Sequence, residues 1–322
     1  MPSSTCSLNW PPPPPSFSSS ARWSWSLSSS TCSAGPCAEP FRSNMIALMR
    51  RRSGAVARYS LLVVVAFVAL LPTYVMFTGA FKTQSDFLSS PFGLPLSPNL
   101  DGFSRVLSDQ FPAWFMNSVI VTGLSAVITI AVAAFAAWGF AHWDFPGRST
   151  ILGVVVSLMV IPPVVLLIPL FQLGAQLGWI STFRLLILIY IGLMLPFSIY
   201  MLTNFFSTVP VSILEAARMD GASSWVTFVR IVLPLSKAPL ATLAIVNILW
   251  AWNELLLALV LMQSNEMKTL MVGLTGFQSR YSLDIPTVMA GMSIATLPLL
   301  VAYMFGQRYF IQGLTAGAVK GE

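Results

Sequence analysis

Long stretches without a charged residue constrain this chain more than any other feature. A helix needs about 20 apolar residues to cross the hydrocarbon core of a bilayer, and a charge near its centre is costly. Six runs lack Asp, Glu, Lys and Arg, and the fifth continues past Glu254 to Asn265: 59–81, 110–143, 149–183, 185–214, 238–253 and 285–307. None alternates with a period of two, so helices fit and a membrane barrel does not. Trimming polar and proline-rich edges predicts transmembrane helices near 59–81, 115–140, 150–173, 185–205, 238–262 and 286–307.

Composition supports an all-α integral membrane protein. Hydrophobic residues make up 56% of the 322-residue chain and charged residues only 9%, whereas soluble domains carry about 25% charged residues. Such a chain could not cover itself with a water-compatible surface, which excludes an ordinary soluble enzyme and a disordered regulator. One histidine and three cysteines leave little material for a metal site. With no Ser–His–Asp or Cys–His pattern either, we expect no enzymatic activity, metal or cofactor.

The net charge of +6 indicates membrane orientation rather than nucleic-acid binding. Its one dense basic run, residues 50–52, directly precedes the first apolar segment, where cytoplasmic flanking charge belongs. With the N-terminus inside, ten basic residues lie inside: Arg50, Arg51, Arg52, Arg58, Arg148, Arg218, Arg230, Lys237, Arg308 and Lys320. Five lie outside: Lys82, Arg105, Arg184, Lys268 and Arg280. This bias predicts that both termini are cytoplasmic.

Residues 1–44 differ from the rest of the chain. They contain fourteen serines and eight prolines, a composition that cannot bury enough apolar surface to offset its ordering entropy. All three cysteines lie here without a second ligand pair or a small domain to cross-link. We expect a disordered tail without function, or an artefact of an upstream start codon. Residues 45–322 then form the six-span domain.

The longest inside loop, 206–237, is more than a connector. Pro210 can begin a short helix through Met219, and Gly221 suits a left-handed cap after it. Ser223 or Ser224 can cap a second short helix through Arg230, closed by Leu233-Pro234. The loop therefore predicts a helix–turn–helix that offers six apolar side chains for contact: Ile213, Leu214, Ala217, Trp225, Phe228 and Val229. A docking surface and a loop folded back on its own spans both fit this composition.

The same loop resembles a known family. It carries Glu215-Ala216-Ala217, then Gly221, then Ile231, Leu233 and Pro234, with Asp220 before the glycine. Seven fixed positions over 20 residues match the EAA motif of binding-protein-dependent ABC transporter permeases. Trp252-Asn253-Glu254 resembles the carbohydrate-uptake branch, the maltose and multiple-sugar type, and the resemblance covers roughly Arg50 to Lys320.

The resemblance implies how such a protein works. The coupling loop would insert into a cleft on an ATP-binding subunit, with Glu215 holding it there and Gly221 allowing the sharp turn. Two ATP-binding subunits, a second similar permease and an external substrate-binding protein would complete an importer in a bacterial inner membrane. This chain carries no phosphate-binding loop, because neither Lys82-Thr83 nor Lys268-Thr269 follows the required glycine. ATP hydrolysis is therefore expected in another polypeptide.

Glu254 is the only acidic residue well inside a predicted span. An intramembrane carboxylate is a functional candidate by default, and with Trp252 and Asn253 beside it we favour a structural or gating role over sugar contact. Several aromatic residues could stack on a sugar, although membrane interfaces are their more common place: Tyr190, Phe197, Tyr200, Trp250 and Trp252. The single histidine, His142, is expected in a surface loop.

Three classes of function remain open at this stage. The leading hypothesis is a permease subunit of an ATP-driven importer of a sugar or oligosaccharide. The same subunit type could carry another solute, such as an amino acid, a peptide or a phosphonate. An ion-coupled secondary transporter is less favoured, because such carriers usually show internal repeats or several intramembrane charges, and here only Glu254 qualifies.

Overall fold

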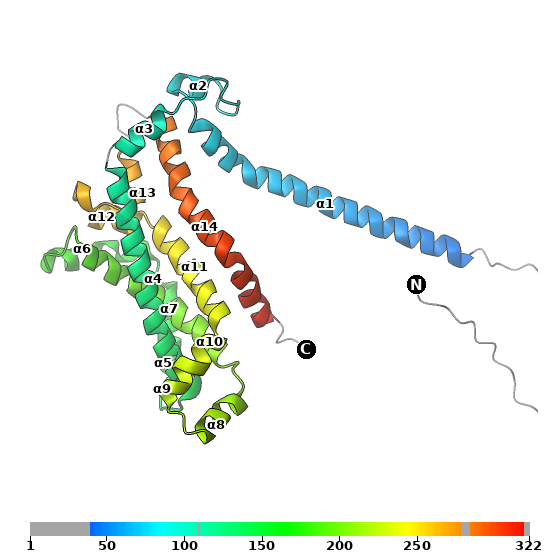
Figure 1. Ribbon diagram of the computed structural model, residues 1–322, viewed down its shortest axis with the longest axis vertical. Helices are drawn as coiled ribbons and strands as arrows, with labels where there is room; N and C mark the ends of the chain where they lie inside the picture. The colour runs from blue at the N-terminus through cyan, green and yellow to red at the C-terminus, as the bar shows by residue number, and fades with distance from the viewer. Residues whose placement is uncertain (1–38, 109, 278–283, 319–322) are drawn as a thin grey trace, which may run out of the picture. The chain divides into compact units, whose positions relative to one another are not determined.

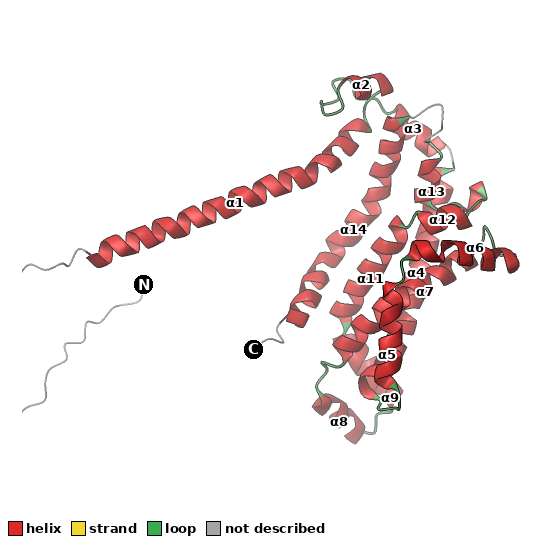
Figure 2. Cartoon of the chain, turned by 180° about the vertical axis from the view of Figure 1, so that it is seen from behind, coloured by secondary structure: helices red, strands yellow, loops and turns green. Residues whose placement is uncertain are grey.

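The computed structural model describes residues 39–108, 110–277 and 284–318, and every secondary-structure element in that part of the chain is helical. Figure 2 shows helices joined by loops. The chain divides into two units, Met1–Val64 and Val65–Glu322. All described residues of the first unit belong to helix α1 (Glu39–Gly79), which continues into the second unit. The predicted all-α membrane fold is confirmed.

Four long helices form the frame of the second unit. Helices α4 (Phe111–His142) and α7 (Phe183–Phe206) pack against each other, and α11 (Lys237–Asn253) packs against both α4 and α14 (Ile285–Ala318) (Figure 1). The shorter α-helices are α2 (Gln84–Ser89), α3 (Asp101–Ser108), α5 (Arg148–Ser157), α6 (Leu167–Gln176), α8 (Val211–Met219), α9 (Ser224–Thr227), α10 (Leu233–Leu235), α12 (Leu256–Leu261) and α13 (Leu270–Thr275). A π-helical turn, η3, covers Phe228–Val232, and 3-10 turns cover Leu158–Val160 (η1), Pro163–Leu166 (η2) and Asn265–Met267 (η4).

The described helices account for the predicted spans in two ways. Four helices are long and apolar enough to cross a membrane: Arg58–Gly79, Phe111–His142, Phe183–Phe206 and Ile285–Gln307. Two bent pairs bring the number to six if each counts as one span. The third and fifth predicted spans are therefore not continuous helices.

The third span bends by 89° between Arg148–Val160 and Pro163–Gln176. Ile161 and Pro162 take extended backbone, with ψ of 114° and 132°. Consecutive prolines explain the break, because a proline removes an N–H donor and disfavours helical backbone in the residue before it. The expected helix over 150–173 is corrected to two helical pieces.

The fifth span was expected as one helix over 238–262, but α11 ends at Asn253. Glu254 has φ −68° and ψ 122°, which is outside the helical region, and a new helix begins at Leu256. At its other end, α11 follows Ser224–Leu235 across a 75° bend. The chain on both sides of α11 therefore turns sharply.

Apolar side chains bury themselves in three clusters along the bundle. One, near the end of α4 that contains Trp138, includes Leu202, Phe206 and Phe228. A second surrounds Tyr190 and Leu257. The third surrounds Trp114 near the start of α4 and includes Leu270 and Trp252. Close packing in these clusters supplies the dispersion contacts that hold membrane helices together.

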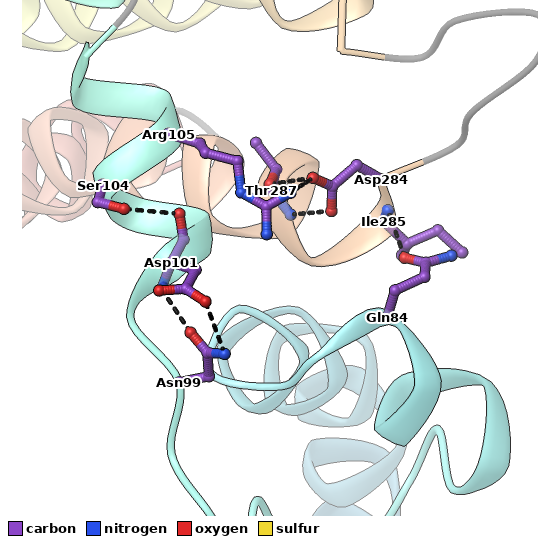
Figure 3. A network of polar contacts seen from close by, with 8 residues as sticks. All are labelled: Gln84, Asn99, Asp101, Ser104, Arg105, Asp284, Ile285 and Thr287. Atoms are coloured by element: carbon purple, nitrogen blue, oxygen red, sulfur yellow. Dashed lines mark hydrogen bonds and ion pairs between the residues drawn. The ribbon is translucent and has the colours of Figure 1, made fainter.

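Polar contacts join α2 and α3 to the start of α14 (Figure 3). Asp284 accepts hydrogen bonds from the backbone N–H of Thr287 at 3.3 Å and from its hydroxyl at 2.6 Å, which caps the helix. Arg105 of α3 forms an ion pair with Asp284, and the N–H of Ile285 donates to Gln84 Oε1 at 3.0 Å. Since the Arg105 side chain is 61% exposed, the ion pair contributes little to the free energy of folding. It links α3 to the start of α14.

Candidate functional site

The predicted helix–turn–helix is present between α7 and α11. Helix α8 spans Val211–Met219, with Pro210 just before it. Gly221 follows with φ +77°, its N–H donates to the carbonyl of Arg218 at 3.0 Å, and the N–H of Ala222 donates to the carbonyl of Ala217 at 2.9 Å. This pair of bonds with a left-handed glycine is a Schellman cap. A Cβ at Gly221 would meet nothing within 4 Å, so only the backbone conformation favours glycine here.

The second helix of this hairpin is longer than predicted. The Ser223 hydroxyl accepts a hydrogen bond from the N–H of Val226 at 3.3 Å and caps α9. Helical structure then continues through the π-helical turn Phe228–Val232 into α10 and ends at Leu235. The expected end at Arg230, closed by Leu233-Pro234, is corrected: the helical segment includes Leu233 and Pro234 and ends one residue after the proline, at Leu235. We call residues 211–235 the hairpin.

Of the six apolar side chains that were expected to be available for contact, three are buried and three are exposed. Leu214, Ala217 and Phe228 are buried within the chain's own fold, so this part of the expectation is corrected. Ile213, Trp225 and Val229 are exposed, and Val211 and Met219 on α8 join them. The hairpin therefore uses one face to pack against the bundle and leaves another apolar face uncovered.

The hairpin contacts α4 through the exposed Trp225 ring and the buried Phe228 ring. Trp225 stacks on Phe135 with ring centroids 5.3 Å apart and planes within 5°. Phe228 packs against Phe135, Trp138 and Phe206 at 5.4, 5.6 and 6.4 Å. Aromatic pairs at these separations contribute beyond their buried area. The alpha-helical ladder changes to a π turn at Phe228, a feature frequent at functional sites.

The motif residues occupy different environments within the hairpin. Glu215, Ala216, Asp220, Gly221 and Pro234 are exposed. Ile231 and Leu233 are half-buried, and Ala217 is buried at 6% exposure. The first part of the motif thus lies at an accessible surface on α8 and its cap, and the last part lies where the hairpin approaches α11.

Glu254 sits at the break between α11 and α12. Its carboxylate accepts hydrogen bonds from the backbone N–H groups of Leu257 at 2.9 Å and Ala258 at 3.1 Å, and from the Tyr190 hydroxyl at 2.8 Å. The side chain thus caps α12 and ties it to α7, satisfying backbone donors that the break would otherwise leave unpaired. Tyr190 was singled out in the sequence only as an aromatic; its pairing with Glu254, 64 positions away, has no local signal.

The two neighbours of Glu254 differ in burial. Trp252 is buried, donates its indole N–H to the carbonyl of Ala295 at 3.2 Å and packs edge-on against Phe115. Asn253 is exposed and donates to the carbonyl of Leu249 one turn earlier at 2.7 Å. Because Tyr190 and Trp252 are buried by the fold itself, these two aromatic rings are not open for stacking on a sugar.

The remaining aromatic candidates are more accessible. Phe197 and Trp250 line an apolar cavity of about 700 Å³ beside η1, η2, α6 and α7, and Tyr200 is 43% exposed. His142 is the last residue of α4 rather than a loop residue, and it stacks on Trp138 with ring centroids 4.1 Å apart. Within residues 39–108, 110–277 and 284–318, no group of three His, Cys, Asp or Glu side chains comes together as a metal site would require.

The described part of the chain is thus a bundle of membrane-length helices with a partly exposed hairpin between α7 and α11. Residues 129–316 match the family described as the binding-protein-dependent transport system inner membrane component. The match covers more than half of the chain, and the protein belongs to this family.

Several relatives are named as sugar permeases of transport systems. The trehalose/maltose permease MalG of Thermococcus litoralis is 35% identical over 265 residues, 81% of this chain and 95% of the relative. The melibiose/raffinose/stachyose import permease MelC of Bacillus subtilis is 31% identical, over 80% of this chain and 94% of the relative. The trehalose permease SugB of Mycobacterium tuberculosis is 33% identical, over 79% and 93%.

Solved structures agree on the fold. A chain of a bacterial ABC transporter involved in the import of the acidic polysaccharide alginate superposes with a TM-score of 0.71 at 23% identity, covering 80% of this chain and 97% of that chain. A chain of a bacterial alginate ABC transporter in complex with a pentasaccharide-bound periplasmic protein gives a TM-score of 0.61 at 17% identity. The resemblance found in the sequence is therefore confirmed at the level of family and fold.

Proposed function

We propose that this permease carries a sugar or oligosaccharide in an ATP-driven importer and that its hairpin is the contact with the ATP-binding subunit. The observation that supports this role is the placement of the EAA-type motif. Glu215 and Gly221 lie on an exposed helix and its cap, while the buried face of the same hairpin packs on α4. A surface element anchored in this way transmits force between a docked partner and the spans.

The proposal includes the rest of the assembly. Two ATP-binding subunits, a second similar permease and an external substrate-binding protein complete the importer in a bacterial inner membrane, with both termini and the hairpin cytoplasmic. Family membership favours this class over the ion-coupled carrier considered from the sequence. Relatives named for trehalose, maltose, raffinose and stachyose share only the sugar class, so the individual sugar is not part of the proposal.

Within this proposal, Glu254 is a structural or gating residue rather than a sugar ligand. Its carboxylate is already engaged by two backbone N–H groups and the Tyr190 hydroxyl. Its hydrogen bonds join the C-terminal end of α11 to α7 and α12. A movement of α7 relative to α11 would therefore strain these bonds. The residues that line the translocation path remain to be found by labelling.

Orientation and partnership are tested together. Reporter domains fused after Gly93 and after Gln263 should behave as external, and one fused after Ser224 as cytoplasmic. The ATP-binding subunits should co-purify with the intact chain, and membranes holding the full complex should take up a labelled oligosaccharide such as maltose, trehalose or raffinose but not a labelled amino acid. An external signal at Ser224 would end this account.

A further inference from the structure

The segment from Leu261 to Leu270 crosses one end of the bundle with almost no helical structure of its own. It contains only the short turn η4, so most of its backbone N–H and C=O groups need partners from elsewhere. Side chains from two distant parts of the chain supply them. These side chains come from the first two turns of α4 and from the turn before α7.

Ser181 holds the beginning of this segment. Its hydroxyl accepts hydrogen bonds from the backbone N–H groups of Gln263 and Ser264, each at 3.0 Å, and its own N–H donates to the carbonyl of Leu261 at 2.9 Å. Among described residues other than glycine, Ser181 alone has positive φ, at 58°. Such a conformation is strained for a residue with a side chain and persists where surrounding contacts enforce it.

Three side chains of α4 hold the rest of the segment. The indole N–H of Trp114 donates to the carbonyl of Asn265 at 2.8 Å, and Asn117 Nδ2 donates to the carbonyls of Glu266 and Lys268 at 2.8 and 2.9 Å. The buried Ser118 hydroxyl accepts the N–H of Leu270 at 2.7 Å, which caps α13 from another helix.

Between these fixed points, four consecutive polar residues are exposed, Gln263, Ser264, Asn265 and Glu266. We call residues 263–266 the polar ridge. Their backbone is fixed from both sides, and the Lys268 ammonium adds an internal bond to Asn265 Oδ1 at 2.7 Å. A polar surface that is already ordered loses less entropy when a partner binds than a mobile loop does.

We propose that Asn117, Ser118 and Ser181 are positioning residues that hold the polar ridge in the shape in which the external substrate-binding protein meets it. The inference rests on the proposed function, which places this end of α4 outside the membrane and the hairpin inside. The three residues do not touch the partner. They act through the backbone of the ridge, which would otherwise sample many conformations.

The test uses the complete transporter reconstituted in lipid nanodiscs, with the purified substrate-binding protein of the same system added at increasing concentration. Ser118→Ala removes the hydroxyl that accepts the Leu270 N–H. Ser181→Gly removes the hydroxyl that accepts the N–H groups of Gln263 and Ser264, and glycine also relieves the positive φ. Ser118→Thr keeps the hydroxyl and should behave as wild type. Ser125→Ala is the matched control, because this buried α4 hydroxyl has no hydrogen-bond partner in the described structure.

Two measurements separate positioning from simple stability. Hydrogen exchange at Leu270 in Ser118→Ala, and at Gln263 and Ser264 in Ser181→Gly, should be about tenfold faster or more. The binding-protein concentration giving half-maximal ATPase stimulation should rise about three- to tenfold, with the maximal rate unchanged.

The outcomes distinguish a failure of the proposed function from a failure of the positioning role. If wild-type ATPase activity does not respond to the binding protein, the proposed function fails. If wild type responds but the variants keep the same half-maximal concentration, or lose only maximal rate, the positioning role is overturned. Unchanged hydrogen exchange in both variants overturns it as well, because the hydroxyls would then not hold the ridge.

Discussion

The two ends of α4 are attached to their neighbours by different forces. Near Phe135 and Trp138, the helix contacts the hairpin through stacked and tilted aromatic rings. Near Asn117 and Ser118, it contacts the backbone of residues 266–270, which follow the polar ridge, through hydrogen bonds of 2.7–2.9 Å. These sites lie about 30 Å apart along the helix, given a rise of about 1.5 Å per residue.

The difference indicates different mechanical tasks. Apolar packing is non-directional, so rings can shift against each other and stay in contact. Hydrogen bonds weaken steeply when their angles change, so they fix one geometry. Under the proposed function, the hairpin end would transmit movement, and the ridge end would keep its shape while the helices around it move. The first two variants below each weaken one of these two attachments.

The largest effect is expected at the aromatic contact of the hairpin. Phe228→Ala removes a ring that is 2% exposed and contacts four other aromatic rings, and such truncations cost about 3–5 kcal/mol. The thermal unfolding midpoint of the purified complex should fall, and the ATP-binding subunits should be lost on purification. Val229→Ala, one residue along and 38% exposed, is the control and should keep both properties nearly unchanged.

At the opposite end, close packing against Trp114 should resist even one added methyl group. A Cβ at Gly273 would clash with the Trp114 ring, so Gly273→Ala should lower stability by about 1–3 kcal/mol. Gly192→Ala is the matched control, since its Cβ would meet nothing within 4 Å. Equal unfolding midpoints for the two variants would show that the ridge end is not tightly packed.

Glu254 lies between the two ends and should respond more weakly. Glu254→Gln keeps an acceptor for the cap and for Tyr190, so assembly and much of the transport should remain. Glu254→Ala leaves the buried Tyr190 hydroxyl without its partner, a loss of about 1–3 kcal/mol. Transport assays of both variants decide the matter: complete and equal loss would show that the negative charge itself is required.

The smallest effect is expected from the serine- and proline-rich tail. Removing residues 1–44, so that the chain starts at Met45, deletes no predicted span and no part of the motif. Insertion and transport should match the full chain. Loss of transport at unchanged expression would show that the tail has a function.

Local chemistry explains what the sequence could predict. The hairpin follows from Pro210, Gly221 and Ser223, each of which acts on its own backbone neighbours, and the structure has helices and caps at these positions. The bend after Val160 also had a local signal in Pro162-Pro163, although it was not anticipated.

Contacts between distant residues explain what the sequence could not predict. Phe228 is buried because α4 lies beside it, and Glu254 ends α11 because Tyr190 and α12 engage its carboxylate. Serine at positive φ gives no sequence signal at Ser181, whereas Gly221 signals the same conformation by its residue type. The family motif identified the accessible surface, but the buried surface required the fold.

The central claim is that the hairpin couples a separate ATPase to the spans, and Gly221 tests it most directly. Valine at φ +77° is strained by its branched side chain even though nothing lies nearby, whereas asparagine tolerates the left-handed conformation and serves as the matched control. Glu215→Ala should weaken the same contact more mildly, because exposed apolar side chains of α8 remain.

The measurement is substrate-stimulated ATPase activity, transport and ATPase co-purification in reconstituted membranes. We expect Gly221→Val to insert normally but to lose the ATP-binding subunits or to hydrolyse ATP without transport, while Gly221→Asn keeps most of both activities. Gly221→Val with the ATPase fully bound and transport at the wild-type rate would contradict the account.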